Sequence, residues 1–121
     1  MQPHRLLTFA LGSTATLPET PPPLQPKPVD DPSFVVDDDK AHAGALVYSG
    51  RCTVCHGLGA VAGGYAPDLR ASTIPLNAAA FADVVHGGLL ESRGMPRYPE
   101  LTDGDLEALR HYLRSRARGA P

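Results

Sequence analysis

The residues with the most definite chemistry are two cysteines and a histidine near the middle of the chain. Cys52 and Cys55 are the only cysteines in the 121 residues, and His56 follows directly. This is the Cys-x-x-Cys-His pattern of c-type haem attachment, in which each thiol can bond to one vinyl group of the same porphyrin edge. The adjacent imidazole then serves as the proximal iron ligand. The motif predicts one covalently bound haem c.

Other interpretations of this segment are less well supported by its surroundings. A thiol–disulfide exchange site of this spacing is typical of an α/β context, and no alternating strand–helix pattern surrounds the motif. A zinc site needs four ligands, and the other histidines provide no second pair at short spacing: His4, His42, His86 and His111. A structural disulfide across two residues would leave His56 without a role. The motif therefore favours haem.

Met95 is the predicted ligand on the opposite side of the iron. Apart from Met1 it is the only methionine, and it lies between Gly94 and Pro96 in a segment expected to be a loop. A methionine that only fills a core is less expected in such a loop. His/Met ligation is the arrangement of electron-transfer cytochromes c. The alternatives are ligation by His86 and an open sixth position.

Two residues that follow the motif are candidates for supporting contacts. A ligating histidine normally donates its second ring N–H to an oxygen acceptor, and Pro67 is placed to offer its backbone carbonyl to His56. The alternative is that Pro67 only shapes the loop. Arg70 is a candidate partner for a haem propionate through charge-assisted hydrogen bonds. A solvated surface arginine is an equal alternative.

A helix is expected just before the motif. It covers residues 40–50, begins after Asp38 or Asp39 as N-cap and ends at Gly50. Its apolar positions are Leu46, Val47 and Tyr48.

Two more helices are expected after the motif. Apolar residues at i, i+3, i+4 spacing predict one helix from Asn77 to about His86, stopped by Gly87-Gly88. Another begins after Thr102, which forms a capping-box-like pair with Asp105. The apolar face of this last helix holds Leu106, Leu109 and Leu113. Residues 57–75 are rich in Gly and Pro and are expected to be irregular, so the predicted fold class is all-α.

The first 36 residues differ in composition from the rest. Residues 5–11 have the composition of a short strand, but a lone strand lacks a pairing partner. Residues 18–32 contain seven of the thirteen prolines, which favours an extended tether. The predicted units are residues 1–17 as a strand or N-terminal extension, 18–36 as a Pro-rich linker and 37–121 as the globular domain. We expect few contacts between residues 1–36 and the domain.

The overall charge and hydropathy exclude several classes of partner. The formal net charge of −2 points to neither nucleic acid nor an anionic membrane, and no stretch approaches the roughly 20 apolar residues of a membrane span. Residues 1–17 lack the apolar run and cleavage site of a secretory signal. The arginines near the C-terminus complement a helix dipole or, alternatively, form a docking patch for an acidic partner: Arg110, Arg114, Arg116 and Arg118.

Residues 40–117 resemble the monohaem cytochrome c family beyond the attachment motif. In that family a Gly and an aromatic residue precede the first haem cysteine by eight and four residues, as Gly44 and Tyr48 do. The family packs them against an aliphatic and an aromatic residue on the last helix, matched by Leu109 and Tyr112. The resemblance implies a cytochrome c fold, with three main helices and irregular loops around one haem.

A narrower resemblance covers nearly the whole chain. Residues 57–64, Pro67-Asp68-Leu69-Arg70, Arg93-Gly94-Met95-Pro96 and residues 101–112 are similar to the C-terminal cytochrome domain of soluble quinohaemoprotein alcohol dehydrogenases. Those enzymes join a pyrroloquinoline quinone (PQQ) β-propeller to a cytochrome through a Pro-rich linker. Residues 5–11 resemble the last propeller strand. The propeller, its quinone and its calcium ligands have no counterpart in this chain, so an excised C-terminal part is expected.

The resemblance implies an electron-transfer domain with no catalytic residue of its own. It would take electrons from reduced PQQ of the parent enzyme and pass them to an external acceptor: a small copper protein, a cytochrome or a quinone. A periplasmic location is implied as well. The alternatives are a free-standing periplasmic cytochrome c that shuttles electrons and a haem enzyme or sensor with an open sixth position.

Overall fold

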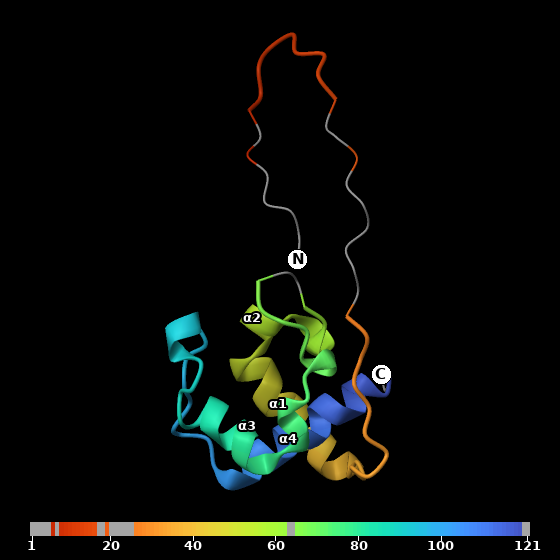
Figure 1. The fold of residues 1–121 in the computed structure, drawn as a ribbon, viewed down its shortest axis with the longest axis vertical. Helices are drawn as coiled ribbons and strands as arrows, with labels where there is room; N and C mark the ends of the chain where they lie inside the picture. Colours follow the sequence, from red (N-terminus) through yellow and green to blue (C-terminus); the bar gives the residue numbers. More distant parts are fainter. Residues whose placement is uncertain (1–5, 7, 17–18, 20–25, 63–64, 120–121) are drawn as a thin grey trace.

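The computed structural model describes residues 6, 8–16, 19, 26–62 and 65–119. These residues form helices and loops and contain no strand. The α-helices are α1 (Asp38–Arg51), α2 (Thr53–His56), α3 (Ala78–Val85) and α4 (Asp103–Ala117) (Figure 1). Short 3-10 turns occupy Leu58–Ala60, Leu69–Ala71, Ile74–Leu76 and Glu91–Arg93. The all-α prediction, with three main helices, is confirmed; α2 adds a single turn at the motif.

Helix α1 begins and ends slightly outside the predicted bounds. Its N-cap is Asp37, whose carboxylate accepts the backbone N–H of Lys40 at 3.1 Å. The prediction of Asp38 or Asp39 was wrong, because both of these carboxylates lie in the first turn instead. Gly50 does not end the helix, since the helical hydrogen bonding continues to the N–H of Cys52, which bonds the carbonyl of Tyr48. The haem-attachment motif therefore follows directly on α1.

Helices α3 and α4 begin where the sequence predicted. Asn77 caps α3 by accepting the backbone N–H of Ala80 at 2.9 Å. Thr102 and Asp105 form the expected capping box of α4. The hydroxyl of Thr102 accepts the N–H of Asp105, and the carboxylate of Asp105 accepts the N–H of Thr102. Such reciprocal caps satisfy two helix donors that would otherwise lack partners.

The crossing of α1 and α4 forms the frame of the domain (Figure 1). At Gly44 the two backbones are so close that a Cβ atom would lie 2.0 Å from the carbonyl oxygen of Ala108. The rings of Tyr48 and Tyr112 meet at this crossing, with centroids 5.0 Å apart and planes tilted by 46°. The contact expected from the cytochrome c resemblance is confirmed, and it requires glycine at position 44.

The N-terminal part differs from the predictions in its contacts with the domain. Leu6 and residues 8–11 form no strand, and no described segment is paired with them, which is consistent with the missing pairing partner noted from the sequence; Arg5 and Leu7 lie outside the described residues. The expectation of few contacts with the domain is wrong for residues 26–36, which lie against α4 through hydrogen bonds to its arginines. The arginine side chains on the polar face of α4 are hydrogen-bond donors, and oxygen atoms of residues 26–36 accept these bonds. The boundaries at residues 17/18 and 36/37 stay predictions.

Candidate haem-binding site

A large apolar cavity lies between the helices and the two long loops. Its volume is about 790 Å³, within the range of about 300–1,000 Å³ for small-molecule and cofactor sites. Side chains from α3 and α4 supply the apolar walls: Phe81, Val84, Val85, Leu109 and Leu113. Cys52, Cys55, His56, Pro67 and Met95 also line it, so the structure brings these predicted residues together. A thiol pair, an imidazole and a thioether around an apolar cavity fit a covalently held haem.

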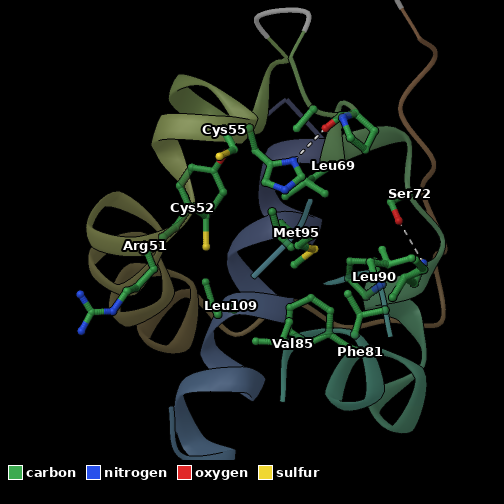
Figure 2. A pocket seen from close by; sticks show the side chains of 18 of the residues that line it. Arg51, Cys52, Cys55, Leu69, Ser72, Phe81, Val85, Leu90, Met95 and Leu109 are labelled. Atoms are coloured by element: carbon green, nitrogen blue, oxygen red, sulfur yellow. Dashed lines mark hydrogen bonds between the residues drawn. The ribbon is translucent and has the colours of Figure 1, made fainter. Parts of the chain in front are cut away.

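Both cysteines face this cavity from the junction of α1 and α2 (Figure 2). Cys52 is the C-cap of α1 and precedes α2, whose first hydrogen bonds run from the N–H groups of Cys55 and His56 to the carbonyl of Cys52. This tight turn puts residues three and four apart on the same side. Burial, and then the nearby Cys55, raise the pKa of the Cys52 thiol to about 11. Such a thiol is a poor nucleophile at neutral pH, which disfavours a thiol–disulfide exchange site.

His56 is held with one ring nitrogen turned to the backbone. It is 7% exposed, and its Nδ1 lies 3.0 Å from the carbonyl oxygen of Pro67. A carbonyl has no proton to give, so Nδ1 carries a hydrogen, and in the neutral ring the lone pair is then on Nε2. The predicted contact with Pro67 is present, and it leaves the imidazole in the tautomer that a metal-bound histidine needs.

Met95 reaches the cavity from the loop that precedes α4 (Figure 2). Gly94 adopts the left-handed conformation, with φ +90°, directly before it, and the N–H of Met95 bonds the carbonyl of Leu90 at 3.2 Å. Tyr98 ties the same loop to the motif, because its hydroxyl donates to the carbonyl of Arg51 at 3.1 Å. The loop thus presents a thioether to the cavity that His56 also lines.

The competing ligand sets are less well placed. His86 does not line the cavity, and its Nε2 is hydrogen-bonded to the carbonyl of Leu101. Across the described ranges there is no group of three or more His, Cys, Asp or Glu side chains that could hold a metal ion; His4 lies outside those ranges. Of the candidates with a free coordinating atom, Met95 is the one at the cavity.

Arg70 forms an ion pair with Asp68. Its guanidinium donates from Nε to Oδ1 at 3.0 Å and from Nη2 to Oδ2 at 2.8 Å, and a contact of Arg70 with a haem propionate stays a prediction. The Asp68 side chain is only 1% exposed, so it needs this counter-charge. Burial acts to raise the pKa of Asp68, but the Arg70 hydrogen bonds outweigh it and hold the pKa below its usual value. Neither sequence alternative for Arg70 described this pairing.

Two supporting residues were not identified as such from the sequence. Asp68 lines the cavity and carries the Arg70 ion pair; the signal was its spacing of two residues from an arginine. Tyr48, predicted only as a packing residue, also donates its hydroxyl to the carbonyl of Gly57 at 2.8 Å. Burial raises the pKa of this phenol well above its usual value. The Tyr48 contact stabilises the backbone directly after His56, and the Asp68 contact stabilises the loop that carries Pro67.

The architecture and the cavity define a c-type cytochrome domain, and a family comparison agrees. Residues 39–113 match the family described as cytochrome C oxidase, cbb3-type, subunit III. The chain belongs to this family of c-type cytochrome domains.

Individual relatives give a more specific likeness. The chain is 39% identical over 120 residues to quinohemoprotein alcohol dehydrogenase ADH-IIG of Pseudomonas putida, covering 97% of this chain and 16% of that protein. It is 36% identical to quinohemoprotein alcohol dehydrogenase ADH IIB of the same species, with 93% of this chain and 16% of that protein covered. Lupanine 17-hydroxylase [cytochrome c] of a Pseudomonas species is 34% identical, with 95% and 16% covered.

A solved structure supports the same likeness in three dimensions. The structure of ADHIIG from Pseudomonas putida HK5 superposes with a TM-score of 0.64 at 39% identity, covering 89% of this chain and 15% of that chain. The predicted resemblance to the quinohaemoprotein alcohol dehydrogenases is confirmed. This chain spans about a sixth of the length of these relatives. No helix in the described part of the chain has the length and apolar character needed to cross a bilayer.

Proposed function

We propose that this chain is the electron-transfer domain of a PQQ-dependent quinohaemoprotein alcohol dehydrogenase. It accepts single electrons from reduced PQQ on a β-propeller and passes them to an external acceptor. The observation that carries the proposal is that Cys52, Cys55, His56 and Met95 all line the same apolar cavity. The similarity to two quinohemoprotein alcohol dehydrogenases supports the choice of parent enzyme.

Four residues hold the cofactor in this proposal. Cys52 and Cys55 provide the two thioether bonds, while His56 and Met95 are the iron ligands. When bound, haem c supplies a one-electron iron couple whose potential a methionine ligand raises. The Pro67 carbonyl orients His56 and increases the basicity of its Nε2. The apolar walls from α3 and α4 keep water away from the iron.

The chain contributes no catalytic residue to alcohol oxidation. PQQ and calcium are assigned to the propeller of the parent enzyme, and the proposed location is the periplasm. The external acceptor is a small copper protein, a cytochrome or a quinone. Because the oxidation of one alcohol releases two electrons, two successive single-electron transfers through the haem are needed for each turnover.

A reconstitution experiment tests the proposal. The haem-loaded chain is mixed with a PQQ-loaded, calcium-containing propeller of a quinohaemoprotein alcohol dehydrogenase that lacks its cytochrome part. On addition of ethanol the haem should become reduced, with two haems reduced for each ethanol oxidised. Omission of PQQ from the propeller is the control and should leave the haem oxidised.

The other candidate functions predict different results in the same experiment. A free shuttle would exchange electrons with a small copper protein but would not be reduced by the propeller. A sensor or haem enzyme with an open sixth position would bind carbon monoxide immediately on reduction, whereas a Met95-ligated iron would resist it. Either result would overturn the proposal.

A further inference from the structure

Helix α4 has two different faces. One is apolar and lines the cavity, and the other is polar and charged. Glu107, His111, Arg114 and Arg118 are spaced by four, three and four residues, so they lie along one stripe of the helix. The apolar stripe instead holds the core residues Leu106, Leu109 and Leu113, of which Leu109 and Leu113 line the cavity. Residues 26–37 run along the polar stripe, as the segment leading into α1 in Figure 1 shows.

The C-terminal arginine of the stripe holds the segment at several points. Arg118 donates to the carboxylate of Asp30 at 2.7 Å, to the carbonyl of Asp31 at 2.8 Å and to the carbonyl of Phe34 at 2.7 Å. Nearer the start of α1, Nδ1 of His111 accepts the N–H of Asp37 at 2.9 Å. This segment is therefore part of the folded domain rather than a free tether.

Arg114 is the most buried member of the stripe. It is 1% exposed, and its guanidinium binds two backbone carbonyls from segments far apart in sequence: Nη1 donates to Val29 at 2.8 Å and Nη2 to Leu69 at 3.0 Å. Among the described residues no carboxylate forms an ion pair with it. A buried guanidinium without a paired anion is costly, and the two carbonyl contacts offset part of that cost.

One contact of Arg114, at Leu69, lies on the loop that carries the acceptor for His56, and the other, at Val29, lies on a segment bonded to that loop. The N–H of Val29 donates to the carbonyl of Arg70 at 2.9 Å, so the segment and the loop are joined directly as well as through Arg114. Leu69 is two residues from Pro67, whose carbonyl lies 3.0 Å from Nδ1 of His56. Pro67, Asp68 and Leu69 all line the cavity. The guanidinium of Arg114 thus binds the same stretch of backbone that lines the cavity.

We propose that Arg114 is a positioning residue that joins residues 26–36 to the loop at residues 67–71 and thereby holds the Pro67 carbonyl on His56. The segment that leads from the rest of the protein is then coupled mechanically to the His56 side of the haem. Detachment of the segment would loosen that hydrogen bond and weaken the basicity of the imidazole.

The test uses the haem-loaded chain and three variants. Arg114→Met removes the guanidinium with little loss of volume. Val29→Pro removes the N–H that donates to Arg70 and fixes the local φ, but it keeps both Arg114 and the carbonyl at position 29 that Arg114 binds. Ser115→Ala is the control, because Ser115 is the next residue in α4 and its hydroxyl donates to the carbonyl of Tyr112 in the same helix.

Amide hydrogen exchange is the first readout. In the unsubstituted protein the Val29 amide should exchange at least about tenfold more slowly than the amides of Thr8 and Phe9, which should exchange as in an unfolded peptide. Arg114→Met should remove this protection while that of Leu109 in α4 stays within about twofold. Equal exchange at Val29 with and without Arg114 would overturn the anchoring role.

The reduction potential is the second readout, and it alone rests on the proposed function. A weaker imidazole donor stabilises the oxidised iron less, so the potential should rise in Arg114→Met and in Val29→Pro and stay unchanged in Ser115→Ala. If Arg114→Met fails to fold, the potential of Val29→Pro tests the coupling between the segment and His56. An unchanged potential in Val29→Pro would overturn the coupling to His56. Failure of His56 ligation itself would instead appear in the spectrum of the unsubstituted protein.

Discussion

The two sides of the haem cavity, one carrying His56 and the other Met95, are stabilised by different kinds of contact. On the His56 side, side chains brace the loop: Arg70 pairs with the buried Asp68, and Arg114 binds the carbonyl of Leu69. On the Met95 side, the loop is held mainly by backbone hydrogen bonds, such as those from Tyr98 to Val85 and from Met95 to Leu90. We infer that the His56 side is preorganised, whereas the Met95 side depends more on the bound haem.

Loss of both thioether bonds should have the largest effect. In Cys52→Ala/Cys55→Ala, haem is no longer retained covalently, and the apolar walls of a cavity of about 790 Å³ are exposed to water. We expect a largely unfolded protein, because a domain of this size buries little apolar surface without its cofactor. Mass spectrometry after denaturation and a thermal transition followed by circular dichroism measure both effects.

The matched control for this variant is Val54→Ala, since Val54 lies between the cysteines and is almost fully exposed. It should keep both the haem and the transition. A cooperative transition in haem-free protein would contradict the prediction. Any protection from exchange that remains without haem should be on the His56 side. Protection confined to the Met95 loop would mean that the Met95 side, and not the His56 side, is preorganised.

Gly44→Ala tests the helix crossing that both sides share. The added methyl group would lie 2.0 Å from the carbonyl oxygen of Ala108, so α1 and α4 must separate, at a cost of about 3 kcal/mol or more. Urea unfolding of the haem-loaded protein measures this loss. Gly50→Ala is the control: nothing lies within 4 Å of the new Cβ, and helix propensity should stabilise it by up to about 1 kcal/mol. Equal stability of the two variants would contradict the crossing geometry.

Met95→Ala tests the Met95 side directly. Loss of the thioether ligand should lower the reduction potential by on the order of 0.1 V, a fraction of the roughly 0.8 V range that axial ligands span. The methionine-to-iron charge-transfer band of the oxidised protein should disappear. His86→Ala is the control and should retain the band, because His86 does not line the cavity. Survival of the band in Met95→Ala would identify another ligand.

Asp68→Asn tests the ion pair of the His56 side and its pH dependence. The folded pKa of Asp68 is lowered from the model-compound value of 3.8, so its charged form contributes stability that is full above that value and is lost as the pH falls through the lowered pKa. At pH 7 we expect Asp68→Asn to cost about 1–3 kcal/mol. The difference from the unsubstituted protein should shrink as the pH falls below 3.8.

The corresponding pair on the Met95 side provides the control. Arg51 and Glu100 are 3.5 Å apart, and both side chains are about half exposed, so Glu100→Gln should cost at most about 1 kcal/mol. Urea unfolding at several pH values compares the two variants. If Glu100→Gln costs as much as Asp68→Asn, the two sides are braced equally and the comparison fails.

Local sequence determined the helices and the residues that face the cavity. The caps at Asn77 and Thr102 were predictable because a short polar side chain satisfies helix N–H groups within three residues of itself. The motif at Cys52, Cys55 and His56 was recognisable because its chemistry depends on covalent spacing along the chain. Gly44 followed from a family pattern whose physical basis is the close approach of two helices.

The tertiary structure alone decided which partners the polar side chains take. The pairing of Arg70 with Asp68 was not predicted, because burial of that carboxylate depends on how the loop folds over the cavity. Residues 26–36 were predicted to be a free tether from their proline content. They lie on α4 because Arg114 and Arg118, 85 and 88 residues away from Val29 and Asp30, supply donors to their backbone and side chains. Contacts across such separations leave no periodic or local signal in the sequence, so only the folded chain reveals them.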